Sequence, residues 1–327
     1  MLNNEQRETV RVAEAHPADR HLVDDLERSL DDAAPPRLAR NAVPRELLAP
    51  ASVRGLTRMT AEEWAMMISL WGAMAMAPRW LWPLLVLPLA GRFHALGVVL
   101  HDATHMPLRR KTAGVRAVEI FCGYPIASTL NAMRYHHIRH HRDSGMHTDP
   151  YFKSGDRGAW WWIRNTLLRG VVLVPFWSIR PLAGVVALVV PTLRNFYGRV
   201  FLQDKSGDDL RHSRELIDCA RAELGQLAFL ALVIAATVRW PLALTAGYLI
   251  PVVVAAVLAA RRVLIEHNYE RVSDRRVDTI IATTNDNHLG LLGAVMLAPR
   301  NIGYHIVHHI HPQARLESLP RLRAWYG

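Results

Sequence analysis

The sequence predicts an all-α integral membrane protein with four transmembrane helices in two hairpins and a cytoplasmic helical cap. Three observations lead to this fold class: two long apolar runs, a turn signal inside each run, and histidine clusters at or beyond the ends of the runs. Half of the 327 residues are hydrophobic, and ten are tryptophan. This composition is typical of a few buried spans joined to a large water-facing part.

Residues 1–60 are polar and interrupted by prolines. They predict an N-terminal cytoplasmic segment ahead of a membrane domain that covers residues 61–327. The first twenty residues lack a basic region followed by an apolar stretch, so no cleaved signal peptide is expected. Two cysteines cannot build a disulfide framework, which indicates a reducing compartment for the bulk of the chain.

The first apolar run lies between Glu63 and Arg92 and carries Arg79 as its only charge. One membrane span needs about 20 residues, because each residue rises ~1.5 Å and the hydrocarbon layer is ~30 Å thick. The run is too long for one span, and APRW at 77–80 offers a turn. We therefore expect a hairpin at about 62–100, whose second helix continues toward His101.

The second apolar run extends from Leu224 to Ala260, with Arg239 alone inside it. VRWP at 238–241 divides the run and predicts a second hairpin at about 224–260. Both turns place a tryptophan beside an arginine, which is typical of a membrane interface. Two buried core hairpins of a soluble protein are the alternative interpretation.

Residues 165–195 are apolar but contain Arg180 and the prolines at 175, 181 and 191. Each apolar piece between these residues is too short to cross a bilayer. The pattern therefore predicts an interfacial or re-entrant segment that does not cross.

The net charge of +10 raises the question of a nucleic-acid partner. The excess of basic residues instead flanks the apolar runs, as at Arg261-Arg262 and Arg275-Arg276, which marks the cytoplasmic side and its anionic lipids. No recognition-helix or RNA-platform motif accompanies them, so nucleic-acid binding is not expected. We expect a multi-pass protein of a bacterial inner membrane, with its termini and histidine clusters on the cytoplasmic side.

Three histidine clusters and one further histidine lie beyond the apolar runs. HDATH places His101 and His105 at i and i+4, on one helix face. An H-x-x-H-H pattern occurs at 137–141 and again at 305–309, and on a helix each triplet offers three imidazoles to one locus. His267 follows the second hairpin. Unrelated basic surface clusters are the alternative, but they do not explain why each cluster lies beside a membrane-like segment.

This set of histidines favours a metal site with two redox-active ions. Structural zinc takes four ligands, usually including cysteine, and the sequence has no C-x-x-C. Imidazole also suits iron and copper. Eight or nine imidazoles are more than one ion holds, so they fit two ions with a position left open. Two irons beside an open position indicate dioxygen chemistry. If the clusters form one site, an even number of spans must separate the second cluster from the third.

The order of the three clusters around two hydrophobic hairpins resembles the membrane fatty-acid desaturase superfamily, over about residues 61–323. APRNIGYHIVHHIHPQARLESLPRL is similar to the third histidine box of the desaturase branch, and EHNYE with DTIIATTND is similar to the region before it. Two positions depart from the pattern. Val307 stands where many desaturases have Glu or Gln, and His311 adds a histidine, as in the hydroxylase branch.

The resemblance implies a non-haem di-iron centre with two Fe ions, O2 as co-substrate, four transmembrane helices and a cytoplasmic cap that carries the ligands. By position, it implies that the metal ligands are His101, His105, His137, His140, His141, His267, His305, His308 and His309. His136 and His311 are alternative ligands if the register is shifted.

Polar residues beside the expected ligands are candidates to orient the imidazole rings by accepting their distal N–H protons. Asp102, Asp149 and Glu266 are adjacent to ligand positions, and Asn301 is a candidate for the same task or for holding a metal-bound water. An ordinary cap or surface contact is the alternative for each.

These observations predict an O2-dependent desaturase that introduces a double bond into a fatty-acyl or lipid-like chain. An external electron donor, such as a ferredoxin with its reductase, is expected because the sequence has no G-x-G-x-x-G fingerprint for a cofactor of its own. The nearest alternative is a hydroxylase or ketolase acting on a lipid, a carotenoid or another hydrophobic substrate. A non-catalytic membrane metal-binding or transport protein is the alternative from another class.

Overall fold

The structure is a computed structural model that describes residues 42–106, 111–287 and 290–327. Residues 1–41 of the expected N-terminal segment, and Arg109 and Arg110 of one basic run, lie outside the described residues. Within the described ranges the chain forms helices and no strands. A single isolated bridge pairs His267 with Thr284.

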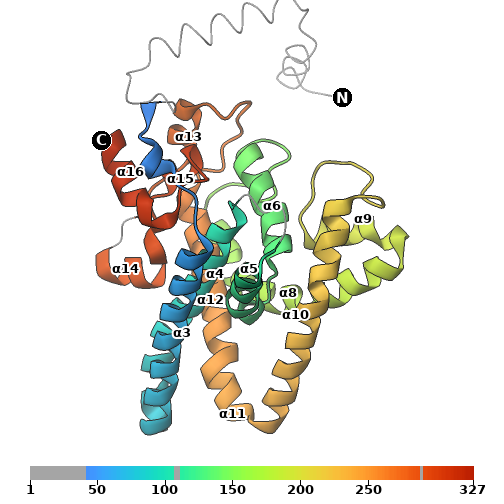
Figure 1. Ribbon diagram of the computed structural model, residues 1–327, viewed down its shortest axis with the longest axis vertical. Helices are drawn as coiled ribbons and strands as arrows, with labels where there is room; N and C mark the ends of the chain where they lie inside the picture. The colour runs from blue at the N-terminus through green and yellow to red at the C-terminus, as the bar shows by residue number, and fades with distance from the viewer. Residues whose placement is uncertain (1–41, 107–110, 288–289) are drawn as a thin grey trace, which may run out of the picture.

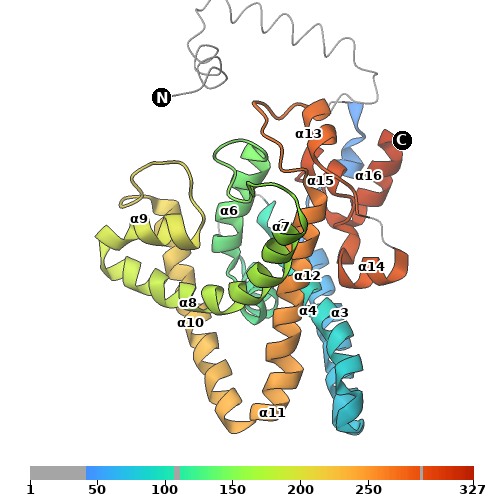
Figure 2. The ribbon, with the colours of Figure 1, turned by 180° about the vertical axis from the view of Figure 1, so that it is seen from behind.

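Five long helices carry the architecture. Figure 1 shows α3 and α4 side by side, and α10 and α12 diverging from the turn at α11. The turn between α3 and α4 and the turn at α11 lie at the same end of the molecule, opposite the helices near the C-terminus (Figures 1 and 2). The five are α3 (Val53–Met76), α4 (Trp82–Thr104), α8 (Arg169–Val189), α10 (Arg214–Arg239) and α12 (Ile250–Glu266).

Shorter elements connect these helices and cover one end of them. The short α-helices are α5 (Ala113–Val118), α6 (Leu130–Asp143), α7 (Ala159–Ile163), α9 (Arg194–Phe196), α11 (Pro241–Leu244), α13 (Val277–Thr283), α14 (Gly290–Met296), α15 (His305–Ile310) and α16 (Leu319–Tyr326). Short 3₁₀ or π turns are η3 (Arg45–Leu48), η4 (Arg79–Leu81), η5 (Glu119–Gly123), η6 (Tyr124–Ile126), η7 (Arg164–Leu168), η8 (Pro191–Leu193), η9 (Tyr197–Phe201), η10 (Thr245–Leu249), η11 (Pro299–Asn301) and η12 (Leu316–Ser318).

Helix α4 lies at the centre and packs against α3, α6, α12 and α14. Its core side chains include Phe93, Leu96 and Leu100, which are fully or almost fully buried. Burial of one such side chain stabilises the fold by about 1.5–3 kcal/mol. The packing of α4 therefore fixes the position of its C-terminal end, where His101 lies.

Four helical stretches in the described residues are long and apolar enough to cross a membrane, judged by length and composition. They are Arg79–Thr104, Ala159–Val189, Arg214–Arg239 and Pro241–Glu266. Three of them correspond to helices of the expected hairpins, and the turns fall where APRW and VRWP predict them. Helix α3, which was to open the first hairpin, is not among the four. It also begins at Val53, inside the expected N-terminal segment.

The stretch at 165–195 differs from its prediction. Instead of short pieces, α7, η7 and α8 form one continuous helix of 31 residues that includes Pro175 and Pro181. The prediction that each piece is too short to span is wrong. The buried Arg180 does not interrupt the helix, because Glu223 of α10 lies 2.7 Å from its guanidinium. Figures 1 and 2 show α8 running across α10 and α12, which fits the expected interfacial position.

Substitution of Gly170 should weaken the contact between α8 and α12. A Cβ at Gly170 would lie 2.6 Å from the Cα of Val257, so backbone must move to admit it. We expect Gly170→Ala to lower the free energy of unfolding by about 1–3 kcal/mol, which is the usual cost of overpacking. Thermal unfolding in detergent measures the change.

Gly72→Ala is the matched control, because a Cβ at this position in α3 meets nothing within 4 Å. It should stabilise the helix by up to about 1 kcal/mol. Equal effects of the two substitutions would contradict the described packing of α8 on α12.

Candidate metal centre

The first two histidine clusters are positioned by the ends of α4 and by the start of α6. His101 lies in the last turn of α4, and His105 is the residue that ends it. Helix α6 begins where the Thr129 hydroxyl accepts a hydrogen bond from the Ala132 amide at 3.1 Å. The Glu119 carboxylate accepts the Leu130 amide at 2.9 Å. Such capping fixes the start of the helix, and with it the direction of the histidines one to three turns later.

The third cluster lies on the short helix α15. The Ile306 amide donates to the Asp286 carboxylate at 2.9 Å, which satisfies a free N–H group in its first turn. The chain before α15 is tied to α3 and α4 by a buried network. Arg300 donates to Glu63 at 2.7 Å. Arg92 of α4 donates to the same carboxylate at 3.0 Å.

His267 is the residue that ends α12, and its backbone is extended. It pairs with Thr284, and the flanking amides of Asn268 and Asn285 bond to the carbonyls of Thr283 and Glu266, both at 2.9 Å. The EHNYE and DTIIATTND stretches therefore lie against each other. This pairing holds His267 near the third cluster.

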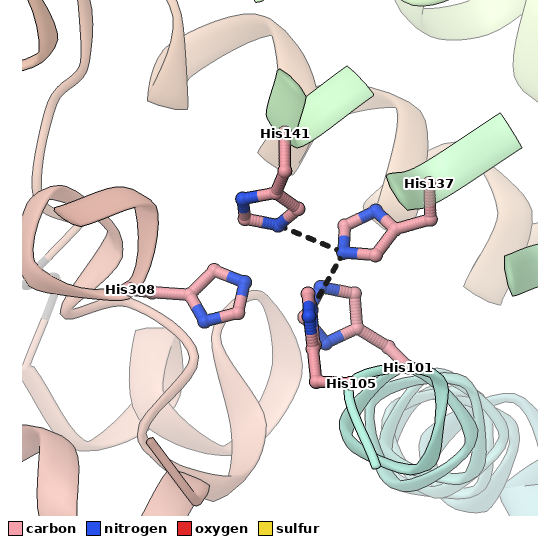
Figure 3. Close-up of side chains that lie close together, drawn as sticks. All are labelled: His101, His105, His137, His141 and His308. Atoms are coloured by element: carbon pink, nitrogen blue, oxygen red, sulfur yellow. Dashed lines mark hydrogen bonds between the residues drawn. The ribbon is translucent and has the colours of Figure 1, made fainter. Parts of the chain in front are cut away.

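Five imidazoles converge in a first group, with ligand atoms within 4.8 Å of one another. Figure 3 shows the rings entering from three separate segments. The Nε2 atom of His137 lies 3.0 Å from Nε2 of His105 and 2.9 Å from Nε2 of His141. The members of the group are His101, His105, His137, His141 and His308.

A second group consists of His140, His267 and His309, again within 4.8 Å of one another. His305 adjoins it, with its Nε2 3.1 Å from Nε2 of both His267 and His309. The Nε2 atoms of His140 and His267 are 3.2 Å apart. The structure thus brings all nine expected ligands into two neighbouring groups. It differs from the expectation that each triplet serves one locus, because both triplets divide between the groups.

The spacing of these nitrogens fits two metal ions. Two imidazoles that bind one ion at about 2.1 Å and at right angles have nitrogens about 3.0 Å apart. The observed Nε2 separations of 2.9 to 3.2 Å match this value. A buried nitrogen without a partner costs about 1–3 kcal/mol. Both ring nitrogens of His308 are buried with no hydrogen-bond partner among the described residues, which fits a ligand position.

Burial sets the charge of these rings. It lowers the pKa of His105 to about 3, with a further contribution from the charge of Arg134. Burial, followed by the charges of neighbouring imidazoles, lowers the pKa of the others outside the apolar helices well below the usual range. These are His137, His141, His267, His305, His308 and His309. The rings are neutral at pH 7, which is the form that binds a metal.

Two of the four expected orienting residues contact a clustered histidine. The Asp149 carboxylate lies 2.9 Å from Nδ1 of His140. The Glu266 carboxylate lies 3.6 Å from Nδ1 of His305. Asp102 instead accepts a hydrogen bond from the backbone of Leu316. Asn301 is exposed and donates to the carbonyl of the same Leu316 at 3.4 Å.

His136 and His311 lie outside both groups, and each has a ring nitrogen bonded to a tyrosine hydroxyl, at 2.7 Å to Tyr151 and at 2.6 Å to Tyr326. Tyr151 also stacks on His140 with ring centroids 4.3 Å apart. It was not predicted from the sequence. Its position two residues after Asp149 is the only signal that pointed to it.

A cavity of about 310 Å³ reaches the two groups from the side of α8 and α12. His137, His140, His267 and His305 line it where it meets the histidines. Its apolar walls include Phe93, Ile126, Val174, Trp177 and Val252. A second opening of about 330 Å³ is lined by His105, His141 and His309 together with Arg142 and Arg275. The histidines therefore have an apolar approach and a separate basic one.

Comparison with known proteins gives one match. A family model described as fatty acid desaturase matches residues 78–327, more than half of the chain. The matched range contains all nine clustered histidines. No curated protein matches the chain.

Removal of one imidazole from either group should lower metal content. We expect His308→Ala and His140→Ala each to bind about half of the iron that the unsubstituted protein binds, because each belongs to a different group. Mass spectrometry of the metal in purified, iron-loaded protein measures this. His212→Ala is the control, since His212 is exposed and outside both groups. Full iron content in both variants would contradict the ligand assignment.

The metal-free protein should lose stability as the pH falls below about 6.5. The unfolded chain takes up protons there, with an ordinary histidine pKa of 6.5, while the folded rings stay neutral because their pKa is lowered. Stability is therefore complete above pH 6.5 and falls toward lower pH, by about 1 kcal/mol per buried histidine at pH 5.5. Unfolding of chelator-treated protein at pH 7.5, 6.5 and 5.5 measures the slope. An unfolding temperature that is constant over this range would exclude the described burial.

Proposed function

This chain belongs to the fatty acid desaturase family, and on that basis we propose that it is a membrane-bound di-iron oxidoreductase that uses O2 to introduce a double bond into a fatty-acyl or lipid-like chain. Family membership implies an oxidoreductase. One observation carries the finer proposal: two adjoining groups of buried, neutral imidazoles lie at the end of an apolar cavity.

Nine histidines are proposed to hold two iron ions. His101, His105, His137, His141 and His308 hold one, and His140, His267, His305 and His309 hold the other. Bound iron supplies the reduction of O2 and the oxidising power that cleaves an unactivated C–H bond. No other side chain type is required in the two groups, because imidazole suits iron.

The protein contributes position, charge and the exclusion of water. The Asp149 carboxylate accepts the Nδ1 proton of His140, so the Nε2 lone pair of that ring points into the second group. Apolar side chains of α4, α8 and α12 hold the acyl chain beside the imidazoles and keep water away from it. Two successive hydrogen removals from neighbouring carbons leave the double bond.

Hydroxylation or ketone formation at the same centre is the second candidate. Val307 stands where many desaturases have Glu or Gln, and it is buried between the two groups' histidines on α15. The fate of the substrate after the first hydrogen removal separates the reactions, since oxygen is then transferred to the carbon instead of a second hydrogen being lost.

We place the histidine groups and the chain termini on the cytoplasmic side of a bacterial inner membrane. Both long turns lie at the end of the molecule opposite the third histidine cluster, which supports this orientation (Figure 1). Electrons are proposed to come from an acidic carrier such as a ferredoxin with its reductase. The opening lined by Arg142 and Arg275 beside His141 and His309 is the side from which such a carrier reaches the groups.

Analysis of host lipids after expression tests the proposal. We expect a new lipid-like product that has lost two hydrogens, and we expect none from the His140→Ala variant. A product that has gained one oxygen would establish the hydroxylase instead. Iron-loaded protein that consumes no O2 in the presence of reduced ferredoxin and yields no product from host lipids would refute catalysis.

A further inference from the structure

The apolar cavity contains more positive charge than its own residues neutralise. Four basic side chains line it. Two of them have buried partners, since Arg180 lies 2.7 Å from Glu223 and Arg262 lies 3.3 Å from Glu266. The other two, Lys153 and Arg169, form no hydrogen bond or ion pair with any residue that the structure describes.

These two unpaired cations lie close to each other. The charge of Arg169 is, after burial, the largest influence that lowers the pKa of Lys153, to about 7. The negative charge of Asp149 acts in the opposite direction, but its carboxylate already accepts hydrogen bonds from His140, Gly145 and Tyr151. A partly buried ammonium group without a counter-ion is costly, so an anion from outside the chain would relieve a penalty that the fold retains.

The cations are placed beside both the metal groups and the apolar walls. Lys153 follows by two residues Tyr151, which stacks on His140. Arg169 is the first residue of α8, and the next residue, Gly170, presses against α12 at Val257. The same cavity continues along Val174 of α8 and Val252 of α12. A ligand that fills it would therefore have one anionic end and one apolar chain.

We propose that Lys153 and Arg169 bind the carboxylate or phosphate head group of the substrate, so that the substrate is an anionic acyl amphiphile and not a neutral hydrocarbon such as a carotenoid. This inference rests on the proposed function, because it assigns the substrate class of the same centre. The guanidinium offers paired donors to a planar carboxylate or to a phosphate, and the ammonium adds a point charge.

Binding of brominated lipids to purified, iron-loaded protein tests the inference. Bromine quenches tryptophan fluorescence at short range, and Trp177 lines the cavity. The probes are dibromostearate, its methyl ester, and a phosphatidic acid with dibromostearoyl chains. We expect dibromostearate or the phosphatidic acid to bind at least tenfold more tightly than the ester, and the tighter of the two identifies the source of the anion.

The variants are Lys153→Gln, Arg169→Gln and their combination. The double variant should lose the preference for the anion while it keeps its affinity for the ester. Arg164→Gln is the matched control, because it removes one positive charge next to α8 without lining the cavity. It should keep the preference of the unsubstituted protein.

Ligand-free stability separates a binding role from a structural one. Lys153→Gln should leave the unfolding temperature unchanged or raise it, because it removes an unpaired charge. Equal binding of ester and anion by the unsubstituted protein, or an unchanged preference in the double variant, would overturn the inference. Oxidised lipid product without anion preference would leave the proposed function standing, whereas anion preference with no product from any probe would refute that function alone.

Discussion

Nine imidazole rings from four separate segments touch one another inside this protein, and they can do so only while they are neutral. Every other feature of the site serves that condition. Burial removes the water that would stabilise a protonated ring. The Asp149 carboxylate fixes the proton of His140 on the outward nitrogen. The inward nitrogens are left as a set of lone pairs that face each other at 2.9 to 3.2 Å, which repel unless cations lie among them.

Helix α4 connects this site to the rest of the fold. It carries the first histidine pair at its C-terminal end, and its middle holds the segment before the third cluster. Arg92 donates to the Val295 carbonyl at 2.6 Å as well as to Glu63. Gly91 allows that segment to approach, since a Cβ there would lie 2.7 Å from the sulfur of Met296. The late cluster is thus held against the early one by a helix that lies mostly inside the apolar core.

The histidine clusters and the two turns were predictable because they depend on local spacing. An H-x-x-H-H triplet places its rings on one side of any helix, and APRW and VRWP mark turns wherever they stand between apolar runs. The continuity of α8 was not predictable, because Arg180 and two prolines resemble breaks until Glu223 arrives from another helix. The division of each triplet between two groups was also hidden. It depends on how α6 and α15 face each other, and no single segment encodes that relation.

The shared use of two helices by both groups has a consequence for biosynthesis. Helix α6 gives His137 and His141 to one group and His140 to the other, and α15 gives His308 to the first and His309 to the second. Neither group is complete until α15 has left the ribosome and docked against α6. The nascent polypeptide must therefore insert most of its apolar helices before it can be metallated, so the cell delivers iron to a chain that is already seated in its final compartment.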